Sequence, residues 1–207
     1  LTAITGYNAG VLRSLERDGY ADAAVLDAVR RLGEQAAEAG RIVQRIRAYL
    51  TRRTPQREHC ELGTILRDAV RLLRRDLERL DLRIEFAIDD DLPPVWADAV
   101  LIEQVIVNLV RNAADELAAA ATHAPRIRLT ARRAGARFVR VDVEDNGPGL
   151  RGRRIEQLAA PFYSTKPDGM GMGLAICRSV VEAHYGGMEA DASPLGGARL
   201  AFTLPIE

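Results

Sequence analysis

Residues 104–115 of the chain read Gln-Val-Ile-Val-Asn-Leu-Val-Arg-Asn-Ala-Ala-Asp. Apolar residues cover most of the circumference of the helix that this spacing predicts, as expected of a buried helix. At about 100° per residue the polar side chains fall within one strip, roughly 80–100° wide, made of Gln104, Asn108, Arg111, Asn112 and Asp115. A buried helix needs a polar partner for such a strip. A phosphate chain with a divalent cation would supply one, because guanidinium groups pair with phosphate oxygens and amide oxygens suit Mg²⁺. A solvent-exposed polar face without a ligand is the alternative.

Alternation between apolar and polar residues predicts a sheet beside this helix. Strictly alternating segments form half-buried strands, which belong to a mostly antiparallel sheet with one covered face and one wetter face. We expect strands at 82–88, 126–132, 138–144 and 199–204, and covering helices at 62–80, 99–120 and 172–185. Asp98 is the expected N-cap of the middle helix. This part of the chain is therefore predicted to be a two-layer α/β sandwich.

A carboxylate and two glycines follow the third expected strand, which ends in Asp145-Asn146-Gly147-Pro148-Gly149. A carboxylate fixed at a strand end can recognise one hydrogen-bond donor on a flat heterocycle, and the glycines let a ligand approach the backbone. An ordinary Asx-Gly turn would explain the same residues.

A glycine-rich loop precedes the last expected helix. It reads Gly169-Met170-Gly171-Met172-Gly173-Leu174 and follows Pro161-Phe162-Tyr163-Ser164-Thr165-Lys166, whose lysine is the only one in the chain. Such a loop at a helix N-terminus presents backbone N–H groups and the positive end of the helix dipole to a phosphate. The glycine spacing matches neither the dinucleotide-binding GxGxxG motif nor the P-loop, which disfavours those two folds.

The first part of the chain has the periodicity of packed helices. Apolar residues from Val25 to Leu50 follow a heptad spacing, and residues 1–15 repeat it with Asn8 in the seam. A break at residues 18–22, with Asp22 as N-cap, makes these segments a helical hairpin. Asn8 either sets the register of the helices or faces solvent at the end of a bundle.

Two helices bury their apolar stripes poorly alone, so we expect a homodimer in which two hairpins form a four-helix bundle. Pro55 cannot continue the second helix. We therefore expect a dimerisation hairpin at 1–54 and a second domain at 55–207. The arginine-rich stretch 41–57 is interpreted as a solvated helix face, with a nucleic-acid surface as the alternative.

Composition excludes several classes of protein. The 207 residues are 47% hydrophobic and 28% charged, which excludes disordered and fibrous chains. The formal net charge of 0 gives no general attraction to nucleic acid or to an anionic membrane. No apolar run approaches the roughly 18 residues of a membrane span. The two cysteines lack CxxC spacing, so we expect a cytoplasmic segment of a protein that could be membrane-anchored upstream.

Four ordered motifs resemble the N, G1, F and G2 boxes of sensor histidine kinases. They are Gln104-x-x-x-Asn108-x-x-x-Asn112-Ala113-x-Asp115, Asp145-x-Gly147-x-Gly149, Pro161-Phe162-x-Ser164-Thr165-Lys166 and Gly169-x-Gly171-x-Gly173-Leu174. The resemblance implies the Bergerat ATP-binding fold, shared with Hsp90-type chaperones, MutL-type repair ATPases and pyruvate dehydrogenase kinases. With the hairpin in front, it covers nearly the whole chain and implies an α+β protein. The run from Thr165 to Leu174 is further similar to the short-lid branch that senses oxygen and metabolites.

The resemblance also implies a site for ATP and Mg²⁺. Asn112 would ligate Mg²⁺, Asp145 would accept a hydrogen bond from the adenine amino group, and the loop 150–168 would be the ATP lid. Thr165 and Lys166 would lie near the γ-phosphate and, with Asn112, act in catalysis. Ala198 stands where the family often has a hydroxyl near adenine, which leaves Thr203 as the candidate substitute. The implied ATP-binding residues are Asn108, Arg111, Asn112, Asp115, Asp145, Gly147, Gly149, Leu150, Ser164, Thr165, Lys166, Gly169, Met170, Gly171, Met172, Gly173, Leu174 and Thr203.

The implied reaction moves the γ-phosphoryl group of ATP to a histidine that begins an H-E-x-x-x-P-L sequence, and then to an aspartate of a response-regulator receiver domain. Leu1-Thr2-Ala3-Ile4 resembles the residues directly after such a sequence, so we expect the phosphoacceptor upstream of Leu1 and none within this chain. His59, His123 and His184 are interpreted as structural or solvated. Two alternatives stay open: a nucleotide-binding dimerisation module without transfer, and a serine kinase or ATPase of the same fold.

Overall fold

A computed structural model describes residues 2–18, 24–36, 55–161, 163 and 171–207. The chain divides into two compact units, Leu1–Arg52 and Arg53–Glu207. The boundary predicted at residues 54 and 55 borders a stretch, 37–54, that lies outside the described residues.

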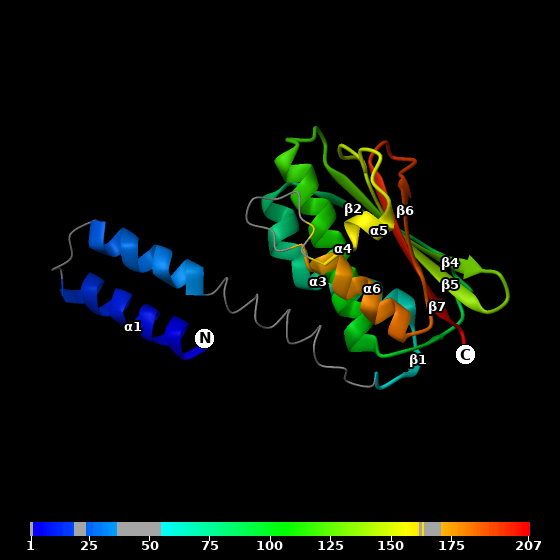
Figure 1. Ribbon diagram of the computed structural model, residues 1–207, viewed down its shortest axis with the longest axis horizontal. Helices are drawn as coiled ribbons and strands as arrows, with labels where there is room; N and C mark the ends of the chain where they lie inside the picture. Colours follow the sequence, from blue (N-terminus) through cyan, green and yellow to red (C-terminus); the bar gives the residue numbers. More distant parts are fainter. Residues whose placement is uncertain (1, 19–23, 37–54, 162, 164–170) are drawn as a thin grey trace. The chain divides into compact units, whose positions relative to one another are not determined.

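The first unit contains two helical segments, α1 (Thr2–Asp18) and residues 24–36 (Figure 1). Asn8 of α1 donates from Nδ2 to the carbonyl oxygen of Val29 at 3.1 Å, so it lies between the helices. A β-carbon added at Gly33 would lie 2.3 Å from the same nitrogen, so a larger residue there would displace the Asn8 side chain from this position. Of the two interpretations of Asn8, the structure supports a polar residue within the seam. The predicted break at 18–22 with its Asp22 cap, and the helix from residue 37 to Leu50, fall outside the described residues.

The second unit is built on a five-stranded sheet in the order β2-β4-β5-β7-β6. Only β2 and β4 run parallel, and the other neighbours pair antiparallel. The strands are β2 (Arg83–Ile88), β4 (Arg126–Ala134), β5 (Phe138–Asp145), β6 (Met188–Ala192) and β7 (Ala198–Pro205). A separate two-stranded sheet pairs β1 (Glu58–Cys60) with β3 (Val95–Ala97). The predicted mostly antiparallel sheet is confirmed, and β1, β3 and β6 are strands that the alternation did not predict.

Three helices pack on one face of the large sheet (Figure 1): α3 (Leu62–Arg79), α4 (Ala99–Ala119) and α6 (Gly173–Ala183). A short helix, α5 (Ile155–Leu158), precedes the glycine-rich loop. The Asp98 side chain accepts from the backbone N–H of Leu101 at 3.2 Å, which confirms it as the N-cap of α4. The arrangement is the two-layer sandwich that the sequence predicts.

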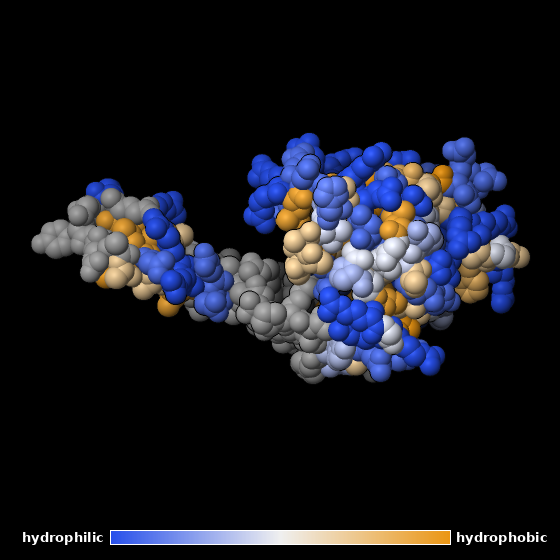
Figure 2. Space-filling view, turned by 90° about the horizontal axis from the view of Figure 1, so that it is seen from above, coloured by the Kyte–Doolittle hydropathy of each residue, from blue (hydrophilic) through white to orange (hydrophobic). Residues whose placement is uncertain are grey.

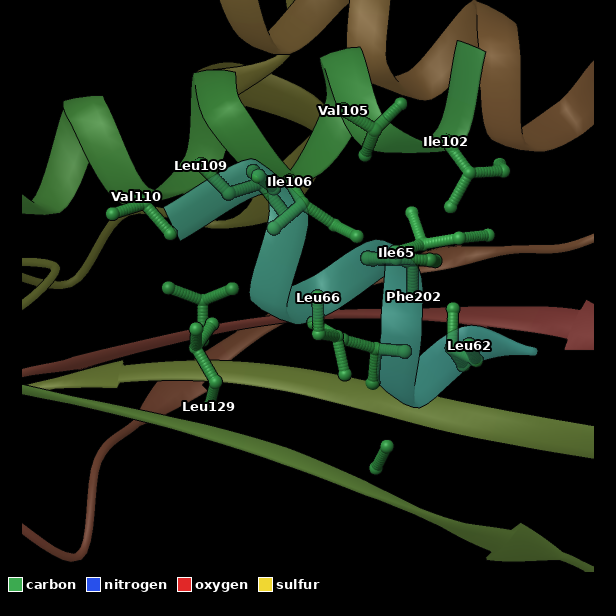
Figure 3. Close-up of a cluster of buried hydrophobic side chains, with 14 of the residues drawn as sticks. Leu62, Ile65, Leu66, Ile102, Val105, Ile106, Leu109, Val110, Leu129 and Phe202 are labelled. Carbon is green, nitrogen blue, oxygen red and sulfur yellow. The ribbon is translucent and has the colours of Figure 1, made fainter. Parts of the chain in front are cut away.

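The hydrophobic core lies between these helices and the sheet (Figure 3). Each large side chain that is fully buried there contributes roughly 1.5–3 kcal/mol to the free energy of unfolding. The labelled members come from α3, α4, β4 and β7, and they are Leu62, Ile65, Leu66, Ile102, Val105, Ile106, Leu109, Val110, Leu129 and Phe202. Because α4 contributes five of these residues, its apolar sides are held by the core and its orientation is fixed.

Charged side chains occupy the other face of the sheet. Asp142 of β5 is almost fully buried and accepts from Arg140 Nε at 2.8 Å and from Thr130 Oγ1 at 3.0 Å. Arg128 Nη2 lies 3.4 Å from Glu85 Oε2 on the neighbouring strands. These charged groups thus pair with one another across the strands, as the predicted wetter face requires. Within the described ranges, none of the helices has the length and apolar character that a membrane crossing requires.

Candidate nucleotide site

Asp145 stands at the end of β5 with 6% of its surface exposed. Its Oδ1 accepts from the backbone N–H groups of Gly147 at 2.8 Å and Ala198 at 3.0 Å. Both of these hydrogen bonds go to Oδ1, so they hold the carboxylate while Oδ2 can accept from a ligand. Burial raises the pKa of the Asp145 carboxyl, the two N–H donors oppose that rise, and the nearby charge of Glu116 adds to it.

Gly197 belongs to this site, and sequence reasoning did not identify it. A β-carbon added there would lie 2.1 Å from Asp145 Oδ1 and 2.4 Å from the Gly147 nitrogen. Only glycine lets β7 begin this close to the carboxylate. The available signal was the Gly196-Gly197 pair directly before the strand that contains Ala198.

The glycines after Asp145 also lie where space is limited. A β-carbon at Gly147 would lie 3.3 Å from Leu117 Cδ2 of α4, which packs the loop closely against that helix. Gly149 has φ +72°, a left-handed conformation that glycine adopts without strain. Leu150, implied as a further contact, is half-buried directly after it. The Asp145 loop is thus fixed between α4 and the start of β7.

The polar strip of α4 lies partly in contact with α6. Asn108, Arg111 and Asn112 are half-buried, whereas Gln104 and Asp115 are exposed. The thiol of Cys177, which is fully buried on α6, donates to the Val105 oxygen of α4 at 3.8 Å. Burial raises the pKa of that thiol to about 12, although the nearby Asn108 side chain acts to lower it, so the thiol stays protonated at neutral pH.

The glycine-rich loop ends beside the same strip. A β-carbon added at Gly173 would lie 3.9 Å from Asn112 Nδ2, so the first residue of α6 lies next to Asn112. Gly171 has φ +64°, Met172 is buried, and Leu174 is half-buried in the first turn of the helix. The remaining implied residues of this region lie outside the described residues: Ser164, Thr165, Lys166, Gly169 and Met170.

Thr203 lies away from this site, which corrects the suggestion that it contacts adenine. It follows Ala198 by five residues on β7, which corresponds to about 17 Å along a strand. Its hydroxyl accepts from the backbone N–H of Gly187 at 3.0 Å, in the turn before β6. Thr203 therefore holds that turn. Ala198, in contrast, donates its backbone N–H to Asp145 Oδ1.

These residues make up a candidate site with two chemically different ends. One end has a buried carboxylate fixed through one oxygen, suited to a donor on a flat ring. The other end has two amides, a guanidinium and the N-terminus of an eleven-residue helix, suited to phosphate oxygens and a cation. A model of the family described as "Histidine kinase-, DNA gyrase B-, and HSP90-like ATPase" matches residues 97–207, which contain both ends.

The chain belongs to this family of ATPases. Among curated relatives, the C4-dicarboxylate transport sensor protein DctS of Rhodobacter capsulatus is 35% identical over 206 residues, covering 100% of the chain and 31% of the relative. The sensor protein FixL of Bradyrhizobium diazoefficiens is 34% identical over 206 residues, covering 99% and 40%. The chain thus spans less than half the length of these sensor proteins.

Solved structures of other proteins have the same fold. Full-length ShkA in complex with AMPPNP superposes with a TM-score of 0.78 and 25% identity, covering 99% of the chain and 43% of ShkA. Histidine kinase ThkA in complex with the response regulator protein TrrA gives 0.73 and 22%, covering 97% and 57%. The predicted resemblance to sensor histidine kinases and the predicted fold are confirmed.

Proposed function

We propose that this chain is the core of a sensor histidine kinase that binds Mg²⁺-ATP and transfers its γ-phosphoryl group to a histidine, for relay to a response-regulator aspartate. The observation that supports this most is the position of Asn112 beside the glycine-rich start of α6, in the same site as the fixed carboxylate of Asp145. An adenine at Asp145 and a triphosphate at Asn112 would use the two ends of the site at once.

At the base end, Asp145 Oδ2 would accept from the adenine amino group while Oδ1 keeps its two backbone donors. Guanine has a carbonyl oxygen in the place of that amino group and would repel the carboxylate. The site should therefore prefer adenine. Gly147 and Gly197 keep the backbone close enough to the ring for this contact.

At the phosphate end, Asn112 would hold the metal through its amide oxygen, with Asn108 and Arg111 near phosphate oxygens. Mg²⁺ keeps several waters and phosphate oxygens among its ligands, so one protein amide suffices. When bound, the ion neutralises charge on the triphosphate. The exposed Asp115 stands on the same strip and is proposed near the metal. Thr165 and Lys166 are proposed near the γ-phosphate.

The transfer step itself needs mainly positioning and charge neutralisation. The bond between the γ-phosphorus and the bridging oxygen of ADP breaks as a bond forms between phosphorus and an imidazole nitrogen. The imidazole proton leaves to a base near the acceptor histidine, and ADP departs with the bridging electron pair. An aspartate oxygen of a receiver domain then takes the phosphoryl group from the imidazole.

The three histidines of this chain are not proposed as the acceptor. His184 is fully buried, its Nε2 accepts from the Asp98 N–H at 3.0 Å, and its Nδ1 lies 2.7 Å from the Val180 oxygen. His59 lies edge-on to Trp96 at 4.9 Å between ring centres. We place the acceptor on an H-E-x-x-x-P-L sequence instead.

The helical unit is proposed to dimerise. Its two described helices leave four large apolar side chains 46–77% exposed, namely Tyr7, Val11, Val25 and Leu32. Figure 2 shows hydrophobic residues at the surface of this unit. Two further helices from a second copy would cover them in a four-helix bundle. The receiver domain of a response regulator is the proposed downstream partner.

Phosphate transfer can be tested by incubating the chain with γ-labelled ATP, Mg²⁺ and a helical-hairpin protein that carries an H-E-x-x-x-P-L sequence. Acid-labile label on that histidine, absent when the histidine is changed to glutamine, is the expected result. ATP binding without any label transfer would favour a nucleotide-binding dimerisation module. Acid-stable label on serine would favour a serine kinase of the same fold.

A further inference from the structure

Asn146, between the fixed carboxylate and Gly147, connects the end of β5 to the segment that joins α4 to β4. Its Oδ1 accepts from the backbone N–H of Arg126 at 2.8 Å, and its Nδ2 donates to the Ala124 oxygen at 3.0 Å. Its own backbone N–H reaches the Arg126 oxygen at 3.3 Å. Both ends of the side-chain amide are therefore hydrogen-bonded to the α4–β4 segment.

The segment that Asn146 holds has an unfavourable backbone conformation. Ala121 and Ala124 both have φ +48°, in the left-handed region that alanine rarely adopts. The segment stays attached to α4, because the Thr122 N–H donates to the Leu117 oxygen at 3.0 Å. A conformation of this kind persists only where neighbouring groups hold it. The hydrogen bond from Asn146 to Ala124 acts on one of the two strained residues.

This connection joins the two walls of the base end of the site. Asp145 and Gly147 flank Asn146 on one wall, and Leu117 lies on the other wall, 3.3 Å from where a β-carbon of Gly147 would stand. The charge of Glu116, next to Leu117 on α4, is close enough to act on Asp145. If the α4–β4 segment relaxed, the last turn of α4 would be free to shift relative to the carboxylate.

We propose that Asn146 is a positioning residue for recognition of the nucleotide base. It sets the separation between Asp145 and the Leu117 turn of α4 without touching the nucleotide. The inference rests on the proposed ATP site and deepens it. It also assigns different effects to different substitutions: Asn146→Asp keeps the acceptor for the Arg126 N–H and loses the donor, whereas Asn146→Ala loses both.

The test compares binding of non-hydrolysable ATP and GTP analogues by wild type, Asn146→Ala and Asn146→Asp, with Mg²⁺ present. Losing two backbone-directed hydrogen bonds should raise the Kd for the ATP analogue about tenfold or more in Asn146→Ala. The Kd for the GTP analogue, which does not use Asp145 in the same way, should rise less than about threefold. Asn146→Asp should fall between wild type and Asn146→Ala.

A matched control removes a structural hydrogen bond of the same unit far from the nucleotide. Thr130→Val deletes the 3.0 Å bond to Asp142 on the charged face of the sheet. It should lower the melting temperature and leave both Kd values unchanged.

Equal loss of affinity for both nucleotides in Asn146→Ala, or no loss for either, would overturn the positioning role while leaving ATP binding by wild type intact. If wild type binds neither nucleotide, the proposed function fails and this inference with it. If Asn146→Ala does not fold, Asn146→Asp decides by the same comparison.

Discussion

Gly197→Ala tests the geometry of the base end most severely. The added β-carbon would lie 2.1 Å from Asp145 Oδ1, 2.4 Å from the backbone nitrogen of Gly147 and 2.6 Å from the backbone carbonyl oxygen of Asp145. Real β-carbons essentially never approach other heavy atoms closer than 3.0 Å. The carboxylate must therefore retreat by roughly 1 Å, which lengthens its hydrogen bonds beyond the usual range of about 2.7–3.2 Å.

The expected losses follow from those two hydrogen bonds. Backbone donors to a charged carboxylate contribute roughly 1.5–3 kcal/mol each. We therefore expect the free energy of unfolding to fall by about 2–4 kcal/mol after partial relaxation. Displacement of Oδ2 removes its hydrogen bond to adenine, which should weaken binding of an ATP analogue about 10- to 100-fold.

Calorimetric titration below the melting temperature, together with thermal unfolding, measures both effects. Gly187→Ala is the neutral control, because a β-carbon there meets nothing within 4 Å. Gly186→Ala is the destabilising control, because its β-carbon would lie 1.8 Å from the backbone carbonyl oxygen of Thr203 and away from Asp145. It should lower the melting temperature without selective loss of nucleotide. Wild-type affinity and stability in Gly197→Ala would show that Gly197 does not fix the position of the Asp145 carboxylate.

Four further predictions concern the metal, the base, pH and dimerisation. Asn112→Ala should abolish the Mg²⁺ dependence of nucleotide binding with the fold intact by circular dichroism; an unchanged Mg²⁺ dependence would remove the metal role. Asp145→Asn should weaken ATP binding more than inorganic triphosphate binding, and equal losses in competition titrations would contradict that assignment. Burial lowers the pKa of His184 from 6.5, so the unfolded state binds the proton more readily than the folded state. The contribution of His184 to the free energy of unfolding should be complete above about pH 6.5 and fall below it. Urea unfolding of His184→Gln should therefore show a flatter pH dependence than wild type, and an identical slope would argue against this role of His184. Leu32→Glu, at a side chain that is 59% exposed, should shift the sedimentation coefficient of a dimer to that of a monomer, whereas an unchanged coefficient would place dimerisation elsewhere.

Long periodic elements of the fold could be predicted from the sequence, and short ones could not. The alternation at 126–132 and 138–144 gave β4 and β5 within two residues at each end, because one face of each strand is buried. The strands β1 and β3 have three residues each, too few to show a period, and exist through their mutual pairing. β6 consists of Met, Ala and acidic residues with weak strand propensity, and its pairing with β7 decides its conformation.

The site was predictable where chemistry is local and not where it depends on tertiary contact. Asp145 and its two glycines lie close together in sequence, so their grouping at the end of β5 could be predicted directly. Gly197 is required because β7 passes close to a residue about fifty positions earlier, which no local pattern records. The suggestion for Thr203 was wrong because the pairing register of β7 cannot be predicted from the sequence of that strand alone. This register pairs Thr203 with Arg140 and not with the end of β5.

We propose that Mg²⁺-ATP binds this chain at the site formed by Asp145 and Asn112. Calorimetric titration of the chain with a non-hydrolysable ATP analogue, with and without Mg²⁺, tests it most directly. We predict one nucleotide per chain, bound at least about tenfold more tightly with Mg²⁺ than without it. Absence of binding under both conditions would show that this chain has no Mg²⁺-ATP site at Asp145 and Asn112.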